Sequence, residues 1–335
     1  MTTSIAVLGA GAWGTAVAAH LARRGDLRVT LWARDAAQAA SMSASRTNAR
    51  YLPGVALPAA LAVTADCGVA VTADLLVVGT PMAALPAVVD RLADLGAVAP
   101  LVWLAKGFLA APEVPAGFAL AHQLIAPRWP AAVGVISGPS FADEVARGLP
   151  TAVTVAATGN ELAGEVAALL HGGTLRAYES DDIAGVEVGG AVKNVLAIAA
   201  GASDGLGFGN NARAALITRG LAETGRLSAV LGGRRETLMG LAGLGDLVLT
   251  CTGDLSRNRR VGLALARGGA LATILGEIGH VAEGVTAAVA VRALAGHHRL
   301  DMPICDAVHR VLYEGVSPKQ AVEALLRREP RAEGA

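Results

Sequence analysis

The stretch SIAVLGAGAWGTAVAAHLARRG, residues 4–25, decides the fold. In it, an apolar run is followed by three glycines and then by an alanine-rich segment that favours a helix. The first glycine allows a tight turn, the second lets the backbone approach a pyrophosphate, and the third lets the helix pack closely on the strand. Free N–H groups at the helix start favour the phosphates. The pattern therefore predicts a dinucleotide site containing Gly9, Gly11 and Gly14.

Apolar segments further along the chain continue an alternation of strands and helices. Strands are predicted within 27–34, 74–80, 101–107, 131–145, 151–157 and 174–180. Such alternation is typical of a doubly wound, mainly parallel sheet with helices on both faces. We therefore expect an α/β dinucleotide-binding domain of the Rossmann type over residues 1–182.

From about residue 183 the pattern changes to Ala-, Leu- and Gly-rich segments with helical spacing. Helices are predicted over 183–202, 212–231, 256–267, 284–296, 303–315 and 318–328. We expect residues 183–330 to form an all-helical domain for substrate binding and catalysis. A cleft between two domains is the usual place for chemistry beside a bound dinucleotide.

Composition excludes several classes of function. The formal net charge of the 335 residues is zero and only 3% are aromatic, which argues against a nucleic-acid groove. The cysteines Cys67, Cys251 and Cys305 lack metal-type spacing, and no metal site is predicted. The most apolar long segment carries Glu187 and Lys193, and no signal peptide is evident. We expect a cytoplasmic protein without stable membrane insertion.

The end of the second predicted strand reports on the nucleotide. About 20 residues after the last glycine, an NAD site usually carries an acid that binds the ribose hydroxyls. This sequence has Arg34 there, followed by Asp35. Because a guanidinium suits a 2′-phosphate, NADP is favoured and NAD stays an alternative. Arg34 as a solvated charge at a strand end is the competing interpretation.

Lysine is rare in this chain. Of 28 basic residues only Lys106, Lys193 and Lys319 are lysines. An arginine stays protonated, whereas a desolvated lysine can release a proton. Lys319 is expected at an exposed helix start, but Lys106 and Lys193 lie in apolar, glycine-flanked segments. We predict a functional role for both, against the alternative that each extends from a helix into solvent.

The stretch GLGDLVLTCTGDLSRNRRVG, residues 243–262, concentrates polar groups in an otherwise apolar chain. Glycines predict a loop over 243–253, and Ser256 is expected to cap the helix that follows. Arginine is unusual in a first helical turn, where free N–H groups already favour an anion. Ser256, Arg257 and Asn258 therefore predict a phosphate site.

Two details qualify this prediction. Asp246 lies near enough in sequence to orient a hydroxyl or an ammonium. The alternative interpretation, a solvated basic face, fits Arg259 and Arg260 better than it fits Arg257.

Seven motifs together, in this order, resemble the bacterial-type NAD(P)-dependent glycerol-3-phosphate dehydrogenases. They are GAGAWGTA (9–16), LAKG (104–107), SGPSFA (137–142), EVGGAVKN (187–194), AAGASDGLGFGNNARAAL (199–216), GLGDLVLTC with SRNR (both within 243–260) and AEGVTA (282–287). One departure is Ala12, where the family commonly has serine, which removes a side-chain hydroxyl from the phosphate loop.

The resemblance implies a role for each matching residue. Lys193 is the implied acid/base catalyst. The implied substrate pocket consists of Lys106, Gly138, Ser140, Lys193, Asp246, Ser256, Arg257 and Asn258. The implied dinucleotide contacts, besides the glycines, are Trp13, Arg34, Lys106, Ala142, Arg257 and Glu283.

The implied reaction is reversible hydride transfer between NAD(P)H and dihydroxyacetone phosphate, which yields sn-glycerol 3-phosphate for phospholipid synthesis. The resemblance also implies a homodimer. Two alternatives stay open from the residues alone. One is a dehydrogenase of 3-hydroxy acids, which needs a carboxylate site. The other is a non-catalytic dinucleotide sensor, which needs the glycine loop only.

Overall fold

The computed structural model describes residues 2–279 and 282–329. The predicted domain limits at residues 1 and 330 fall outside this range. The chain forms two compact units, one of Met1–Ala105 with Ala121–Ile183 and the other of Lys106–Leu120 with Ala184–Ala335. The segment 106–120, predicted within the first domain, is thus part of the second unit. The reason is apolar packing, because Leu120 lies in the second unit's core and Phe108 and Phe118 pack against it.

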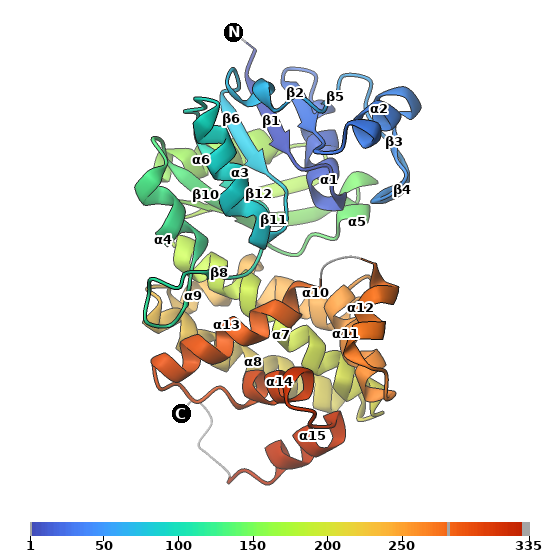
Figure 1. The fold of residues 1–335 in the computed structure, drawn as a ribbon, viewed down its shortest axis with the longest axis vertical. Helices are drawn as coiled ribbons and strands as arrows, with labels where there is room; N and C mark the ends of the chain where they lie inside the picture. Colours follow the sequence, from blue (N-terminus) through green and yellow to red (C-terminus); the bar gives the residue numbers. More distant parts are fainter. Residues whose placement is uncertain (1, 280–281, 330–335) are drawn as a thin grey trace. The chain divides into compact units, whose positions relative to one another are not determined.

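The first unit is built on an eight-stranded sheet of order β12-β11-β10-β7-β6-β1-β2-β5 (Figure 1). Its strands are β1 (Ser4–Leu8), β2 (Arg28–Trp32), β5 (Ala62–Thr64), β6 (Leu75–Val78), β7 (Leu101–Trp103), β10 (Val133–Ser137), β11 (Thr151–Ala157) and β12 (Leu175–Ser180). Neighbouring strands are parallel except β10 and β11. Each predicted strand is confirmed, whereas the edge strand β5 and the antiparallel pairing of β10 with β11 were not predicted.

Helices and a hairpin complete the first unit. The helices are α1 (Ala12–Ala22), α2 (Ala36–Ser45), α3 (Leu85–Asp94), α4 (Ala121–Ile125), α5 (Ala142–Ala146) and α6 (Asn160–Leu170), and the hairpin pairs β3 (Thr47–Asn48) with β4 (Leu52–Ala56). Along β1, Ile5 and Val7 belong to one core cluster, whereas the intervening Ala6 and Leu8 are buried outside it. Since side chains alternate along a strand, both faces of this sheet are covered.

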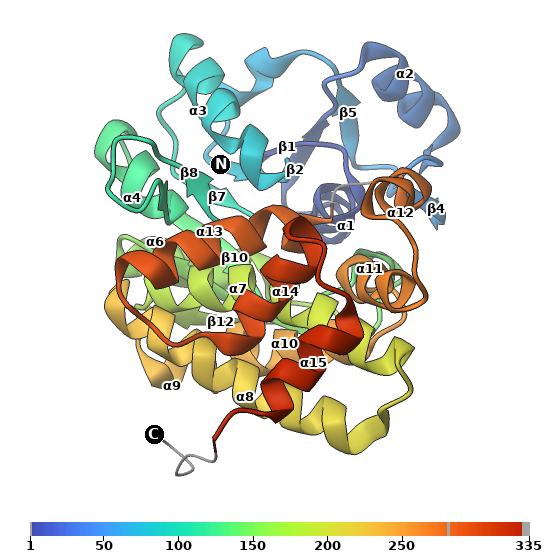
Figure 2. The ribbon, with the colours of Figure 1, turned by 60° about the horizontal axis from the view of Figure 1, so that its bottom comes forward.

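The second unit is helical. Its helices are α7 (Ile183–Gly205), α8 (Gly209–Val230), α9 (Arg235–Leu238), α10 (Asp246–Thr252), α11 (Arg257–Ala266), α12 (Leu271–Ile278), α13 (Glu283–His297), α14 (Pro303–Tyr313) and α15 (Pro318–Leu326). A small hairpin joins β8 (Leu109–Ala110) to β9 (Phe118–Ala119). Helix α14 packs against both α13 and α15 (Figure 2). Each of the six predicted helical segments contains a helix.

Helix α7 is the core of the second unit. This helix is long and apolar enough to cross a membrane. However, 89% of its most apolar stretch is buried inside the protein. Glu223 of α8 supports the same unit, because its carboxylate accepts the N–H groups of Ile304 at 2.7 Å and Cys305 at 3.0 Å at the start of α14. A negative group there is favoured by the helix dipole.

One predicted loop is wrong. Instead of a loop over 243–253, the structure has a π-helical turn, Leu241–Gly245, that runs directly into α10 (Asp246–Thr252). The glycines suggested a loop, but Leu247 and Cys251 are spaced by four residues and are both buried. This spacing gives the segment one apolar helical face, and packing of that face prevails over the low helix propensity of glycine.

Candidate functional site

The glycine loop of the first unit has the close packing that the sequence predicts. A Cβ atom on Gly14 would lie 2.1 Å from the carbonyl oxygen of Gly9, and one on Gly9 would lie 2.8 Å from the carbonyl carbon of Gly79. At Gly11 the nearest atom would be 3.9 Å away. Gly11 is the N-cap residue of α1, and because it has no side chain it provides no side-chain acceptor for the first N–H groups of the helix. Space above Gly11 and uncapped N–H groups at a helix start are the features that a pyrophosphate group requires.

Arg34 and Asp35 follow β2 and have different environments. The Asp35 carboxylate caps α2 by accepting the N–H groups of Ala37 at 2.9 Å and Gln38 at 3.3 Å. Arg34 is exposed and forms no hydrogen bond or ion pair with the residues that the structure describes. Trp13 lies in the first turn of α1 and packs against the core of this unit. The acid beside Arg34 thus has a structural use, while Arg34 is available to a ligand.

The turn after β10 also requires glycine. Gly138 has a φ of 128°, and a Cβ atom there would lie 3.0 Å from the Cα of Val153. The Ser140 hydroxyl donates to the Gly138 carbonyl at 2.9 Å. The expected capping role of Ser140 is wrong, because Phe141 is the N-cap residue and Ala142 begins α5. Ser140 instead stabilises its own turn.

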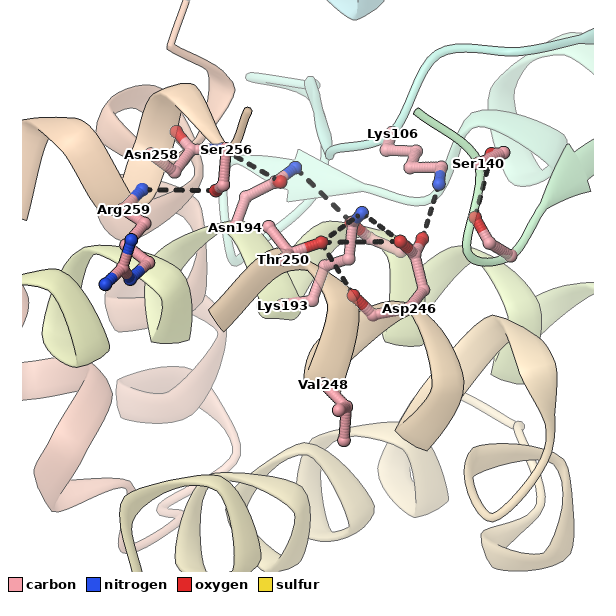
Figure 3. A network of polar contacts seen from close by, with 12 residues as sticks. Lys106, Ser140, Lys193, Asn194, Asp246, Val248, Thr250, Ser256, Asn258 and Arg259 are labelled. Carbon is pink, nitrogen blue, oxygen red and sulfur yellow. Dashed lines mark hydrogen bonds and ion pairs between the residues drawn. The ribbon is translucent and has the colours of Figure 1, made fainter. Parts of the chain in front are cut away.

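The second unit contains a buried ion cluster in which one carboxylate contacts two ammonium groups (Figure 3). Lys193 Nζ donates to Asp246 Oδ1, and Lys106 Nζ donates to Oδ2 of the same carboxylate. Lys193 also donates to the Thr250 hydroxyl at 2.8 Å, and that hydroxyl donates to the Asp246 carbonyl at 2.6 Å. Lys193 is 8% exposed and Asp246 1%. Two predicted lysines and the predicted aspartate therefore meet at one point.

The close approach of α7 to the π-helical turn explains how this cluster forms. Gly189 lies one helical turn before Lys193, and a Cβ atom on it would lie 2.7 Å from the Ala242 carbonyl oxygen. Only glycine allows the two backbones to approach so closely, and Asp246 follows directly after the turn. Gly189 therefore allows α7 to pack closely against the π-helical turn within this unit.

Burial and neighbouring charges set the protonation of the cluster. Burial lowers the pKa of Lys193 to about 8; the Asp246 carboxylate opposes this change and the Lys106 ammonium adds to it. For Asp246, burial acts to raise the pKa, but the two ammonium groups prevail and lower it. An ammonium with a pKa close to neutral and a fixed hydrogen-bond acceptor is suited to donating a proton to a reacting oxygen.

The start of α11 is capped as predicted. The Ser256 hydroxyl accepts the N–H of Arg259 at 3.2 Å. Arg257 is exposed and forms no hydrogen bond or ion pair with any residue in the described part of the chain. A helix start with an unpaired guanidinium is suited to binding an anion.

Asn258 has a structural connection that the sequence did not predict. Its side-chain amide donates to Asn194 Oδ1 at 2.9 Å, and its oxygen accepts the N–H of Gly284 at 3.0 Å. Since Asn194 follows Lys193, this amide joins the predicted phosphate site to the helix that carries the lysine. Glu283, a predicted dinucleotide contact, is the first residue of α13 and is half-buried.

The expected solvated face is wrong for Arg259. This side chain is 11% exposed and binds Asp204, with its Nε at 2.9 Å from Oδ2, and Asp254, with Nη1 at 2.8 Å from Oδ1. Arg213 Nη1 also donates to Asp204 at 2.9 Å. Two arginines held by one half-buried carboxylate form an anchor for α11.

Among the described residues there is no group of three or more His, Cys, Asp or Glu side chains that could hold a metal ion.

Sequence reasoning missed two residues of this site, Thr250 and Asn194. Thr250 lies four residues after Asp246, so a helix over this segment would have indicated that the two share one face. Asn194 lies beside Lys193 on an apolar helix, where a buried amide requires a partner.

Comparison with known proteins gives matches over nearly the whole chain. The sequence profile of the NAD-dependent glycerol-3-phosphate dehydrogenase N-terminus matches residues 4–163, and the profile of the C-terminus of the same family matches residues 182–323.

Individual relatives agree. A glycerol-3-phosphate dehydrogenase (NAD(P)+) of Aromatoleum aromaticum is 57% identical over 333 residues, which covers 98% of this chain and 99% of that protein. A protein of the same name from Burkholderia orbicola is 56% identical over 337 residues, with 98% and 99% coverage. The crystal structure of glycerol-3-phosphate dehydrogenase from Coxiella burnetii superposes with a TM-score of 0.91 at 45% identity and covers 97% of this chain and 99% of that one.

Proposed function

Because this chain belongs to the family of NAD-dependent glycerol-3-phosphate dehydrogenases, we propose that Lys193 is the proton donor of its reaction. The enzyme reduces dihydroxyacetone phosphate reversibly to glycerol 3-phosphate with NADH or NADPH. The reduced nicotinamide supplies a hydride to the ketone carbon, so negative charge develops on the ketone oxygen. Lys193 donates a proton to this oxygen as the charge develops.

One observation carries this proposal, the buried Lys193 ammonium with a pKa of about 8. Asp246 and Thr250 fix its position, and Lys106 on the same carboxylate supplies a second positive charge to polarise the oxygen. The basic test is oxidation of NADPH, followed by nicotinamide absorbance, with dihydroxyacetone phosphate against a 3-oxo acid as the alternative substrate. Turnover of the phosphate ester alone supports it as the substrate, and preference for the 3-oxo acid contradicts that choice of substrate.

The protonation of Lys193 makes the two directions respond oppositely to pH. Ketone reduction requires the ammonium, so kcat/KM for dihydroxyacetone phosphate should fall as the pH rises through about 8. Oxidation of glycerol 3-phosphate requires the neutral amine, so its kcat/KM should rise over the same interval. Both profiles report the pKa of the free enzyme. Two profiles that change in the same direction would remove Lys193 as the shared acid and base.

We infer that the first turn of α11 binds the substrate phosphate through Ser256, Arg257 and Asn258. The guanidinium of Arg257 supports this, because it is exposed at a helix start and has no partner among the residues that the structure describes. Arg257→Ala should raise the KM for dihydroxyacetone phosphate by about 10- to 100-fold, the range for a lost charged hydrogen bond. The matched control is Arg260→Ala on the same helix, since Arg260 is also exposed and without a partner among the described residues. Equal KM values for the two variants would contradict the proposal.

We further propose that Arg34 binds the 2′-phosphate of NADP. Asp35 is engaged at the cap of α2, whereas Arg34 is exposed and unpaired within the described residues. Arg34→Ala should lower kcat/KM for NADPH by about 10-fold or more and leave the value for NADH within about 2-fold. Steady-state measurements of kcat/KM with NADPH and with NADH, on the wild-type protein and on Arg34→Ala, test this prediction. An unchanged ratio of the two values would refute a role of Arg34 in nucleotide choice.

Family membership also supports three proposals about the cell. We propose a homodimer, located in the cytoplasm, that supplies glycerol 3-phosphate for phospholipid backbones. Light scattering on the purified protein tests the first, cell fractionation the second, and loss of labelled glycerophospholipid after gene deletion the third.

A further inference from the structure

A backbone carbonyl inside the glycine loop is held by two side-chain amides. The Ala10 carbonyl accepts a hydrogen bond from Gln38 Nε2 at 3.0 Å and another from Asn48 Nδ2 at 3.0 Å. Gln38 comes from α2 and is half-buried, while Asn48 comes from β3 and is 1% exposed. Elements 28 and 38 residues further along the chain thus converge on one atom of the loop.

Asn48 is held in one orientation by its other contacts. Its amide nitrogen also donates to the Thr15 hydroxyl at 2.8 Å, and its oxygen accepts the N–H of Tyr51 at 3.3 Å. Rotating the amide by a half turn would point its oxygen at the Ala10 carbonyl and its NH2 group at the Tyr51 N–H, so donor would face donor and acceptor would face acceptor. Because Thr15 lies on α1 and is fully buried, Asn48 connects the loop, the helix that follows it and the β3–β4 hairpin.

The geometry of the peptide unit converts this contact into a constraint on Gly11. The carbonyl of Ala10 and the N–H of Gly11 belong to one planar trans peptide and point in opposite directions. Donors that hold the carbonyl therefore direct the N–H of Gly11 away from Asn48 and Gln38. Apart from its two chain neighbours, no atom of the described residues would lie closer than 3.9 Å to a Cβ atom on Gly11, so the loop is open at this residue.

We propose that Asn48, supported by Gln38, is a positioning residue that aims the Gly11 N–H at the pyrophosphate of the bound dinucleotide; this inference rests on the proposed role of the glycine loop. Residue 12 is alanine, which provides no side-chain donor, so the loop depends on backbone N–H groups. A peptide fixed before the cofactor binds loses less conformational freedom on binding.

The first test is Asn48→Asp, which keeps the shape of the side chain but places an oxygen where a donor faced the Ala10 carbonyl. Calorimetric titration with NADPH alone should give a Kd about 10-fold or more above wild type, since a lost hydrogen bond becomes an unfavourable contact. Adenosine 2′-phosphate, which lacks a pyrophosphate, should bind within about 2-fold of wild type. A purely structural role would lower the melting temperature and leave the ratio of the two Kd values unchanged.

A second variant keeps the inference testable if Asn48→Asp does not fold. Gln38→Glu places a carboxylate against the same carbonyl from a half-buried position, and it should also raise the Kd for NADPH. Ala40→Glu adds the same charge at an exposed site of α2 and should have a much smaller effect. Equal Kd values for these two variants would overturn the inference.

Gly14→Val separates this inference from the proposed role of the loop. Its side chain would collide with the Gly9 carbonyl, so NADPH binding should be lost. Normal binding in Gly14→Val would refute the dinucleotide role of the loop itself. Lost binding in Gly14→Val together with wild-type binding in Asn48→Asp would refute only the role of Asn48.

Discussion

Replacing Lys193 with alanine is expected to lower kcat for dihydroxyacetone phosphate reduction by about 10²- to 10⁴-fold, the usual contribution of a general acid. The proposed proton donor is lost, while the carboxylate beside it keeps a partner, because Lys106 still binds Asp246. The variant should therefore fold. Steady-state kinetics at saturating substrate measure the loss of kcat, and calorimetric titration with NADPH should show a Kd within about 2-fold of wild type.

Two further variants make this result specific. Lys193→Arg keeps the positive charge, but its pKa is too high for the group to exchange a proton near neutrality, so reduction and oxidation should both stay slow. Lys319→Ala removes an exposed lysine from the start of α15 and should leave kcat unchanged. Turnover near that of wild type in Lys193→Ala would exclude Lys193 from the mechanism.

The parts of the fold that depend on local sequence could be predicted. Gly9 and Gly14 are required because side chains there would collide with nearby backbone, and the Ser256 hydroxyl caps the helix that its position suggested. Propensity, capping and apolar periodicity act over a few residues, so a single sequence contains them. The same applies to the six helical segments of the second unit.

The ion cluster depends on contacts between distant residues, and its geometry could not be read from the sequence. Lys193 and Asp246 are separated by 53 positions, and Lys106 and Asp246 by 140. Rarity of lysine indicated which amines to consider, but not that one carboxylate binds both. The prediction that Arg259 lies on a solvated face was wrong for the same reason. Asp204, which binds this side chain and removes it from solvent, lies 55 residues earlier in the sequence.

The prediction of a loop around Asp246 was wrong for a different reason. Its glycines indicate a loop by propensity, yet tertiary packing of the face that carries Leu247 and Cys251 makes it a helix. The glycines instead serve close approach, since a Cβ atom on Gly243 would lie 2.1 Å from the Leu238 carbonyl oxygen. A glycine that permits backbone contact and one that permits a turn look alike in sequence.

Asp246→Asn should destabilise the protein by about 3–5 kcal/mol, because removing one partner of a buried ion pair leaves uncompensated charge. Here two ammonium groups, with side chains 13% and 9% exposed, would face each other across a neutral amide. Equilibrium denaturation with urea measures the loss in the free energy of unfolding. Asp254→Asn is the matched control: Asp254 also pairs with a basic side chain but is 96% exposed, so its loss should change stability by about 0–1 kcal/mol.

The double variant Asp246→Asn with Lys106→Met tests whether charge is the cause. Removing one of the two ammonium groups relieves their repulsion, so the double variant should be more stable than Asp246→Asn alone, which independent effects would not produce. Loss of the carboxylate also removes the influence that raises the pKa of Lys193, so the fall in reduction rate with pH should begin at lower pH than in wild type. An Asp246→Asn protein with wild-type stability and an unshifted pH profile would show that the carboxylate neither holds the amines together nor sets the protonation of Lys193.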